Sequence, residues 1–132
     1  MGMLQITATA ACRPTEDREK VRHAILNLIP DAQLEDAEGS LVGRSDSGEA
    51  LREAILNQHI RDTARSVMLQ GVRGNGTRFA LNKQAAFMGK VSFIEGPVAL
   101  GGIEVTVESD DIARTIDHLA ESTVEDRMEE QE

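Results

Sequence analysis

Apolar and polar residues alternate at the start of the chain, where Leu4, Ile6 and Ala8 are separated by polar side chains. A period of two predicts a β-strand over residues 4–12 with one buried face. Gly39 and the pair Gly74 and Gly76 are turn signals between further strands. Alternation bounded by turn residues predicts these strands at residues 32–36, 40–45, 77–82, 90–94 and 103–107.

Apolar residues at helical spacing predict the helices. In the first helix Val21, Ile25 and Leu28 lie on one side, and Thr15 is the predicted N-cap. A second apolar stripe changes phase near residues 57–59, which predicts a bend or break that gives either two helices or one kinked helix.

The last predicted helix begins after Ser109, its predicted cap, and directs Ile116 and Leu119 inward. Residues 83–89 fit either a short helical turn or a strand with a bulge. The pattern leaves both alternatives open.

These elements predict an α+β fold with two layers. Strands joined by hairpins form a largely antiparallel sheet, and helices with one apolar side cover one face of it. Residues 1–120 are predicted to form a single domain, and residues 121–132, half of them acidic, a disordered tail. The uncovered sheet face is predicted to carry polar residues, namely Gln5, Thr7, Thr9, Arg78, Asn82, Glu104 and Thr106.

The whole chain is acidic, with 14 Lys and Arg against 23 Asp and Glu and a net charge of −9. This balance argues against a basic protein that coats nucleic acid. The one cysteine cannot form an internal disulfide, and no apolar run reaches the roughly 20 residues of a membrane span. The N-terminus lacks the pattern of a secretory signal. We therefore expect a cytoplasmic protein without membrane contact.

Charge is unevenly distributed along the chain. Residues 61–90 carry six basic side chains and one acidic side chain, although the chain as a whole is acidic. Arg and Lys bind phosphates, whereas Asn and Gln can contact base edges or sugar hydroxyls. The candidate RNA-binding residues are Arg61, Arg65, Asn82, Lys83, Gln84 and Lys90. The alternative is that these cations pair with the surplus carboxylates elsewhere in the chain.

The sequence motifs do not indicate a phosphate-binding loop or a metal site. A phosphate loop needs Ser or Thr after its Gly-Lys pair, and Val91 follows Gly89 and Lys90. The three histidines are far apart and lack the spacing of metal ligands. We predict no catalytic residue, metal ligand or cofactor. The absence of Tyr and Trp also disfavours a sheet that stacks RNA bases on exposed rings.

Several segments resemble an archaeal family of uncharacterised proteins that is commonly labelled an RNA-binding domain. The resemblance covers residues 4–120 and is carried by PTED at 14–17, IRDTAR at 60–65, LGGI at 100–103 and, above all, LNKQAAFMGKVSF at 81–93. It implies a fold like that of the large-subunit ribosomal protein that contacts 5S RNA. It also implies that the protein belongs to an archaeal cytoplasm and that a homodimer is one expected state.

The leading hypothesis is a non-enzymatic protein that binds structured RNA through its basic residues. The alternative is a homodimeric interaction module with no nucleic-acid role. A small-molecule enzyme would need a pocket of converging polar groups near Lys83 or His59.

Overall fold

The computed structural model describes residues 3–94 and 102–121. In chain order its elements are β1 (Leu4–Ala11), α1 (Arg18–Leu28), β2 (Gln33–Ala37), β3 (Ser40–Ser45), α2 (Glu49–Asn57), α3 (Arg61–Gln70), β4 (Val72–Arg73), β5 (Gly76–Asn82), α4 (Lys83–Phe87), β6 (Phe93–Ile94), β7 (Gly102–Ser109) and α5 (Ile112–Leu119). The predicted tail, apart from Glu121, lies outside the described residues.

The strands form one sheet in the order β2-β3-β1-β7-β5-β4, with β6 paired to β5. Every pairing is antiparallel. The turns at Gly39 and Gly74 have positive φ angles of 74° and 60°, a backbone conformation that glycine adopts without steric cost. The predicted antiparallel sheet and its two hairpin turns are therefore confirmed.

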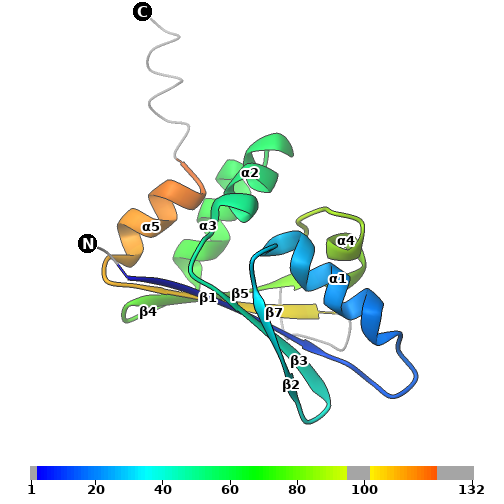
Figure 1. The fold of residues 1–132 in the computed structure, drawn as a ribbon. Coiled ribbons are helices and arrows are strands. Elements are labelled where there is room, and N and C mark those ends of the chain that lie inside the picture. The colour runs from blue at the N-terminus through cyan, green and yellow to red at the C-terminus, as the bar shows by residue number, and fades with distance from the viewer. Residues whose placement is uncertain (1–2, 95–101, 122–132) are drawn as a thin grey trace, which may run out of the picture.

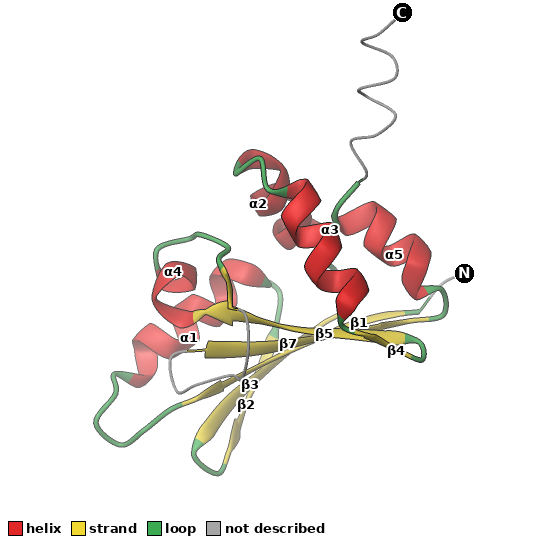
Figure 2. Ribbon diagram, turned by 180° about the vertical axis from the view of Figure 1, so that it is seen from behind, coloured by secondary structure: helices red, strands yellow, loops and turns green. Residues whose placement is uncertain are grey.

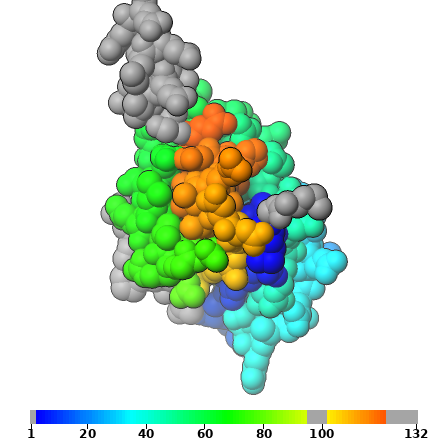
Figure 3. Space-filling view, turned by 90° about the vertical axis from the view of Figure 1, so that its left-hand side faces the viewer, coloured from blue at the N-terminus to red at the C-terminus, as the bar shows by residue number. Residues whose placement is uncertain are grey.

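The helices lie on one face of this sheet in two groups (Figures 1 and 2). α1 packs against α4 at one end, while α5 packs against α2 and α3 at the other. Figure 3 looks onto the second end, where α5 lies beside α3. The predicted two-layer α+β architecture is confirmed.

The core lies between the sheet and the helices. β1 contributes Ile6 and β7 contributes Val107, which are directly opposite each other in the sheet and almost fully buried. From the helical layer, α1, α2, α3 and α5 bury Ile25, Ile55, Met68 and Ile116. Each such side chain contributes about 1.5–3 kcal/mol by leaving water.

The opposite sheet face carries the polar residues that the alternation predicts. Thr7 is opposite Thr106, and Thr106 is in turn opposite Arg78, so that these side chains share one face. Thr9 is opposite Glu104 in the next row. Gln5 belongs to the same face.

Asn82 departs from this pattern because its side-chain oxygen accepts a hydrogen bond from the backbone N–H of Ala85, at 2.8 Å. This contact turns the side chain toward the start of α4. The expectation that Asn82 lines the polar face is therefore wrong.

The predicted caps of two helices are also wrong. α1 is capped by Asp17, not Thr15, because the Asp17 carboxylate accepts from the N–H of Glu19. α5 is capped by Asp111, because Ser109 remains in β7 and its hydroxyl accepts a hydrogen bond from Thr115. The predicted break between α2 and α3 is confirmed: α2 ends at Asn57, and His59 has a φ of 59°.

The structure decides between the two alternatives for residues 83–89, a short helical turn or a strand with a bulge. Residues 83–87 are helical, and the strand expected from residue 90 is confined to Phe93 and Ile94. None of the helices in the described residues is long and apolar enough to span a membrane.

Candidate nucleic-acid interface

The short helix α4 is fixed at both ends by local hydrogen bonds. Asn82 caps its first turn. At its other end Gly89 has a φ of 79°, and its N–H donates to Ala86 O while the N–H of Lys90 donates to Ala85 O. These two bonds form a Schellman motif, which requires a left-handed residue and therefore favours glycine. The residues that fix the two ends of α4, Asn82 and Gly89, lie close together in the sequence.

Lys83 ties α4 to the end of β1. Its Nζ donates to Ala11 O at 2.7 Å and lies 3.0 Å from an Oε of Glu16. The side chain is only 12% exposed. The hydrogen bond from Lys83, together with one from the Arg13 N–H, lowers the pKa of Glu16 below its ordinary value. Lys83 therefore acts in the folded chain as a structural contact with its own carboxylate partner.

The seam between α1 and α4 places an aromatic ring among polar groups. Asn27 of α1 donates to the carbonyls of Ala86 and Phe87, at 2.9 and 3.1 Å. Lys20 lies 5.6 Å from the centre of the Phe87 ring, and the His23 ring meets the same ring edge-on at 5.5 Å. Phe87 is half-buried, while Lys20 and His23 are exposed. A partly exposed ring with a cation beside it is a surface on which a nucleic-acid base can stack.

Lys90 lies where the two helical groups meet. The next residue, Val91, donates its N–H to Gln58 Oε1 at 2.7 Å and accepts from Gln58 Nε2 at 2.9 Å. A side chain thus takes the place of a strand partner, which explains why the strand does not begin at residue 90. Lys90 itself is exposed, as is Gln84 on α4.

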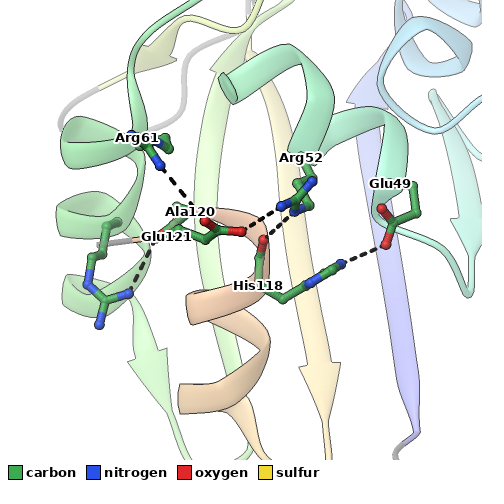
Figure 4. Close-up of polar contacts among 7 residues, drawn as sticks. Glu49, Arg52, Arg61, His118, Ala120 and Glu121 are labelled. Atoms are coloured by element: carbon green, nitrogen blue, oxygen red, sulfur yellow. Dashed lines mark hydrogen bonds and ion pairs between the residues drawn. The ribbon is translucent and has the colours of Figure 1, made fainter. Parts of the chain in front are cut away.

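Arg61 of α3 points toward the end of α5 (Figure 4), and Arg65 of the same helix contacts that end as well. Arg61 Nη1 lies 3.8 Å from a carboxylate oxygen of Glu121. Arg65 Nη1 lies 2.5 Å from Asp117 Oδ1 and donates to Ala120 O at 3.3 Å. For these two arginines, as for Lys83, the structure shows pairing with carboxylates, which is the alternative that the sequence left open.

A third arginine, Arg52 of α2, joins the same cluster. Its Nε donates to His118 O at 2.9 Å, and its Nη2 lies 2.5 Å from Glu121 Oε1. His118 Nε2 is 2.7 Å from Glu49 Oε1. This contact, with a smaller contribution from the charge of Arg52, lowers the pKa of Glu49. Figure 4 shows that α2 and α3 both direct basic groups onto the last turn of α5.

The two helical groups have opposite charge. Residues 12–28 and 83–91, which contain α1 and α4, carry six Lys and Arg against three Asp and Glu. Residues 49–70 and 110–121, which contain α2, α3 and α5, carry four against seven. Within the helical layer the basic group is therefore the one formed by α1 and α4, although Arg18 of α1 pairs with Asp36 of β2.

The structure thus divides the six candidate residues. Asn82, Lys83, Gln84 and Lys90 lie on or beside α4, whereas Arg61 and Arg65 lie on the other helical group. Sequence reasoning missed Lys20, His23 and Phe87. The sequence shows that Lys20 and His23 lie on the same side of one helix, because they are three positions apart. It does not show that Phe87, which is distant in sequence, packs beside them.

Other chemistry has little support in the geometry. The described residues contain no group of three or more His, Cys, Asp or Glu that could hold a metal ion. Two open pockets lie beside β5, and Arg78 lines both of them. Neither pocket is lined by Lys83 or His59, the residues near which an enzyme site was considered.

Comparison with known proteins identifies the family. A family model described as RNA binding matches residues 5–109. A UPF0201 protein from Methanothermobacter thermautotrophicus is 42% identical over 121 residues, covering 89% of this chain and 92% of that protein. The chain belongs to the UPF0201 family.

Solved UPF0201 structures have the same fold. The crystal structure of a UPF0201 protein from Methanococcus jannaschii is 40% identical, with a TM-score of 0.81, and the match covers 90% of this chain and 94% of that chain. A second UPF0201 crystal structure is 36% identical, with a TM-score of 0.83, and the match covers 89% and 94%. The archaeal family expected from the sequence is confirmed. The likeness to the ribosomal protein that contacts 5S RNA stays a prediction.

Proposed function

We propose that this UPF0201 protein binds RNA, without catalysing a reaction, through the basic surface of α1 and α4. We call this the α1–α4 surface and define it by the exposed or half-buried residues Lys20, Arg22, His23, Gln84, Phe87 and Lys90. The observation that carries the proposal is the excess of cations in the helical group of α1 and α4, within a protein with a net charge of −9. The family model described as RNA binding supports the same function.

All residues of the surface except His23 have a role in RNA binding that their chemistry suits. Lys20, Arg22 and Lys90 would bind phosphates, because their charged groups are exposed. Gln84 would contact a base edge or a 2′-hydroxyl, since an amide both donates and accepts. Phe87 would stack on an unpaired base.

The remaining candidates position this surface. Asn82 caps α4, and Lys83 holds it against β1. For Lys83 to contact a phosphate, it would have to exchange Glu16 for the RNA. Arg61 and Arg65 would have to exchange their own carboxylate partners in the same way.

The test is RNA binding measured at several salt concentrations. The probes are a 5S ribosomal RNA transcript, an RNA hairpin and single-stranded polyuridylate. Lys20→Gln and Lys90→Gln should weaken binding, and each lost phosphate contact should reduce the log–log salt slope by about 0.7–0.9. Arg114→Gln is the matched control, because it removes an equal charge from an exposed position of α5.

Three outcomes would overturn the proposal. The wild-type protein could fail to bind all three probes, its binding could be independent of salt, or Arg114→Gln could weaken binding as much as Lys90→Gln does. Sedimentation with and without RNA provides the comparison with the alternative function. A stable dimer that ignores RNA would favour a homodimeric interaction module.

A further inference from the structure

The last turn of α5 is enclosed by arginines that are held by the protein backbone. Arg52 donates through Nε to His118 O, and Arg65 donates through Nη1 to Ala120 O. Carbonyls in the last turn of a helix have no partner within the helix, so these bonds satisfy them. Both side chains are about three-quarters buried, at 28% and 27% exposure. Their guanidinium groups are therefore fixed in place.

Glu121 binds the outer side of this cluster. One of its carboxylate oxygens lies 2.5 Å from Arg52 Nη2, and the other lies 3.8 Å from Arg61 Nη1. The Nε of Arg52 is used by the backbone, so only its outer nitrogen holds the carboxylate. Glu121 is 49% exposed and lies beyond the end of α5. Arg52 is thus held by the backbone, while the carboxylate between Arg52 and Arg61 lies just beyond the end of α5 and is half exposed.

A carboxylate between two guanidinium groups has the same recognition chemistry as a phosphate. Both anions accept charge-assisted hydrogen bonds from the N–H groups along the edge of the guanidinium plane, and a backbone phosphate offers two non-bridging oxygens, as a carboxylate does. The Glu121 side chain is half exposed, so a second anion can reach the two guanidinium groups from water and replace the carboxylate.

We propose that Arg52 and Arg61 form an anion site that Glu121 occupies in the free protein and a backbone phosphate of RNA occupies in the complex. The inference rests on the proposed RNA binding and extends it to the second helical group. Glu121 is then an internal competitor that weakens RNA binding. Arg65 is not part of this site, because it contacts Asp117 and the Ala120 carbonyl.

The experiment compares four proteins: the wild type, Glu121→Gln, Glu53→Gln, and the double variant Glu121→Gln with Arg61→Gln. Glu53 is an exposed residue of α2, so its substitution adds the same charge without touching the site. Glu121→Gln should bind RNA several-fold more tightly than Glu53→Gln, with a salt slope steeper by about 0.7–0.9. The double variant should lose this gain.

A second measurement does not depend on RNA. Inorganic phosphate is titrated into wild type and Glu121→Gln while the Nε–H resonance of Arg52 is followed by NMR. Phosphate should shift this resonance at lower concentration in Glu121→Gln. Thermal unfolding of each variant checks that it is folded.

The outcomes separate the two proposals. If wild type binds RNA but Glu121→Gln behaves as Glu53→Gln does, the competition by Glu121 is refuted and the α1–α4 surface stands. If no protein binds RNA while phosphate still shifts Arg52, RNA binding is refuted and the anion site stands. If phosphate leaves Arg52 unchanged in Glu121→Gln, the anion site is refuted.

Discussion

Gln58 is the side chain whose removal should most clearly loosen the junction between the two helical groups. Its amide makes two hydrogen bonds to Val91, one to the N–H at 2.7 Å and one to the carbonyl at 2.9 Å. Val91 is 4% exposed, so water cannot easily replace these bonds. Gln58→Ala therefore removes two partners from one buried backbone unit.

The magnitude follows from the number of bonds. A hydrogen bond contributes a net of about 1 kcal/mol, and a buried group that is left without a partner costs about 1–3 kcal/mol. We expect Gln58→Ala to lower the free energy of unfolding by about 2–3 kcal/mol. With a urea m-value of about 1–3 kcal/mol per molar, the midpoint of unfolding should fall by roughly 1 M.

Gln58→Glu tests the geometry as well as the magnitude. At neutral pH the carboxylate can accept from the Val91 N–H but cannot donate to the Val91 carbonyl, so this variant should also be destabilised. Once protonated, a carboxylic acid donates and accepts in the same arrangement as the amide. The stability difference from wild type should therefore shrink as the pH falls toward about 4.3, the ordinary pKa of glutamate, and be smallest below that pH.

The assay is urea unfolding followed by circular dichroism, with the variants compared at equal pH. Asn57→Ala is the control, because it changes an exposed neighbour at the end of the same helix. A loss below about 0.5 kcal/mol for Gln58→Ala would refute the reasoning, since surface substitutions alone produce changes of that size. So would a Gln58→Glu variant whose deficit is independent of pH.

Three further substitutions test separate features. His59 has a φ of 59°, so His59→Gly should relieve the left-handed strain and raise the free energy of unfolding by about 0.5–1 kcal/mol in the same urea assay. A Cβ on Gly71 would meet the backbone oxygen of Arg78 at 2.1 Å, so Gly71→Ala should destabilise by at least about 2 kcal/mol, and an unchanged thermal midpoint would contradict this contact. Lys83 lowers the pKa of Glu16 from 4.5, and a depressed carboxyl pKa stabilises the fold above that value. The advantage of wild type over Glu16→Gln should therefore be present at pH 7 and disappear as the pH falls below 4.5, which unfolding at a series of pH values would measure.

Much of the fold follows from periodicity, because alternation and helical stripes depend on which side of an element meets the core. Ile6 and Val107 are buried as their alternation requires, and Ile25 and Ile116 as their helical spacing requires. Helix starts were harder to predict. Thr15 and Asp17 both suit an N-cap, and Asp17 caps α1 by accepting a hydrogen bond from the N–H of Glu19.

The candidate site was predictable only in part. The charge excess along residues 61–90 is visible in the sequence, but the carboxylate partner of each cation is not. Arg61 and Lys83 are near each other in sequence, yet one faces Glu121 and the other Glu16. Likewise, the shortened strand at β6 depends on the Gln58 amide, a tertiary contact across 33 residues.

The opposite charge of the two helical groups has a consequence for how the protein would approach a polyanion. Six basic residues against three acidic ones in the group of α1 and α4, and four against seven in the group of α2, α3 and α5, give the helical layer a dipole between its two groups. In the field of a nucleic acid such a dipole experiences a torque, which rotates α1 and α4 toward the strand before contact. An acidic protein can in this way collide productively with a negatively charged polymer, and dissolved salt that screens the field would slow its capture more than its release.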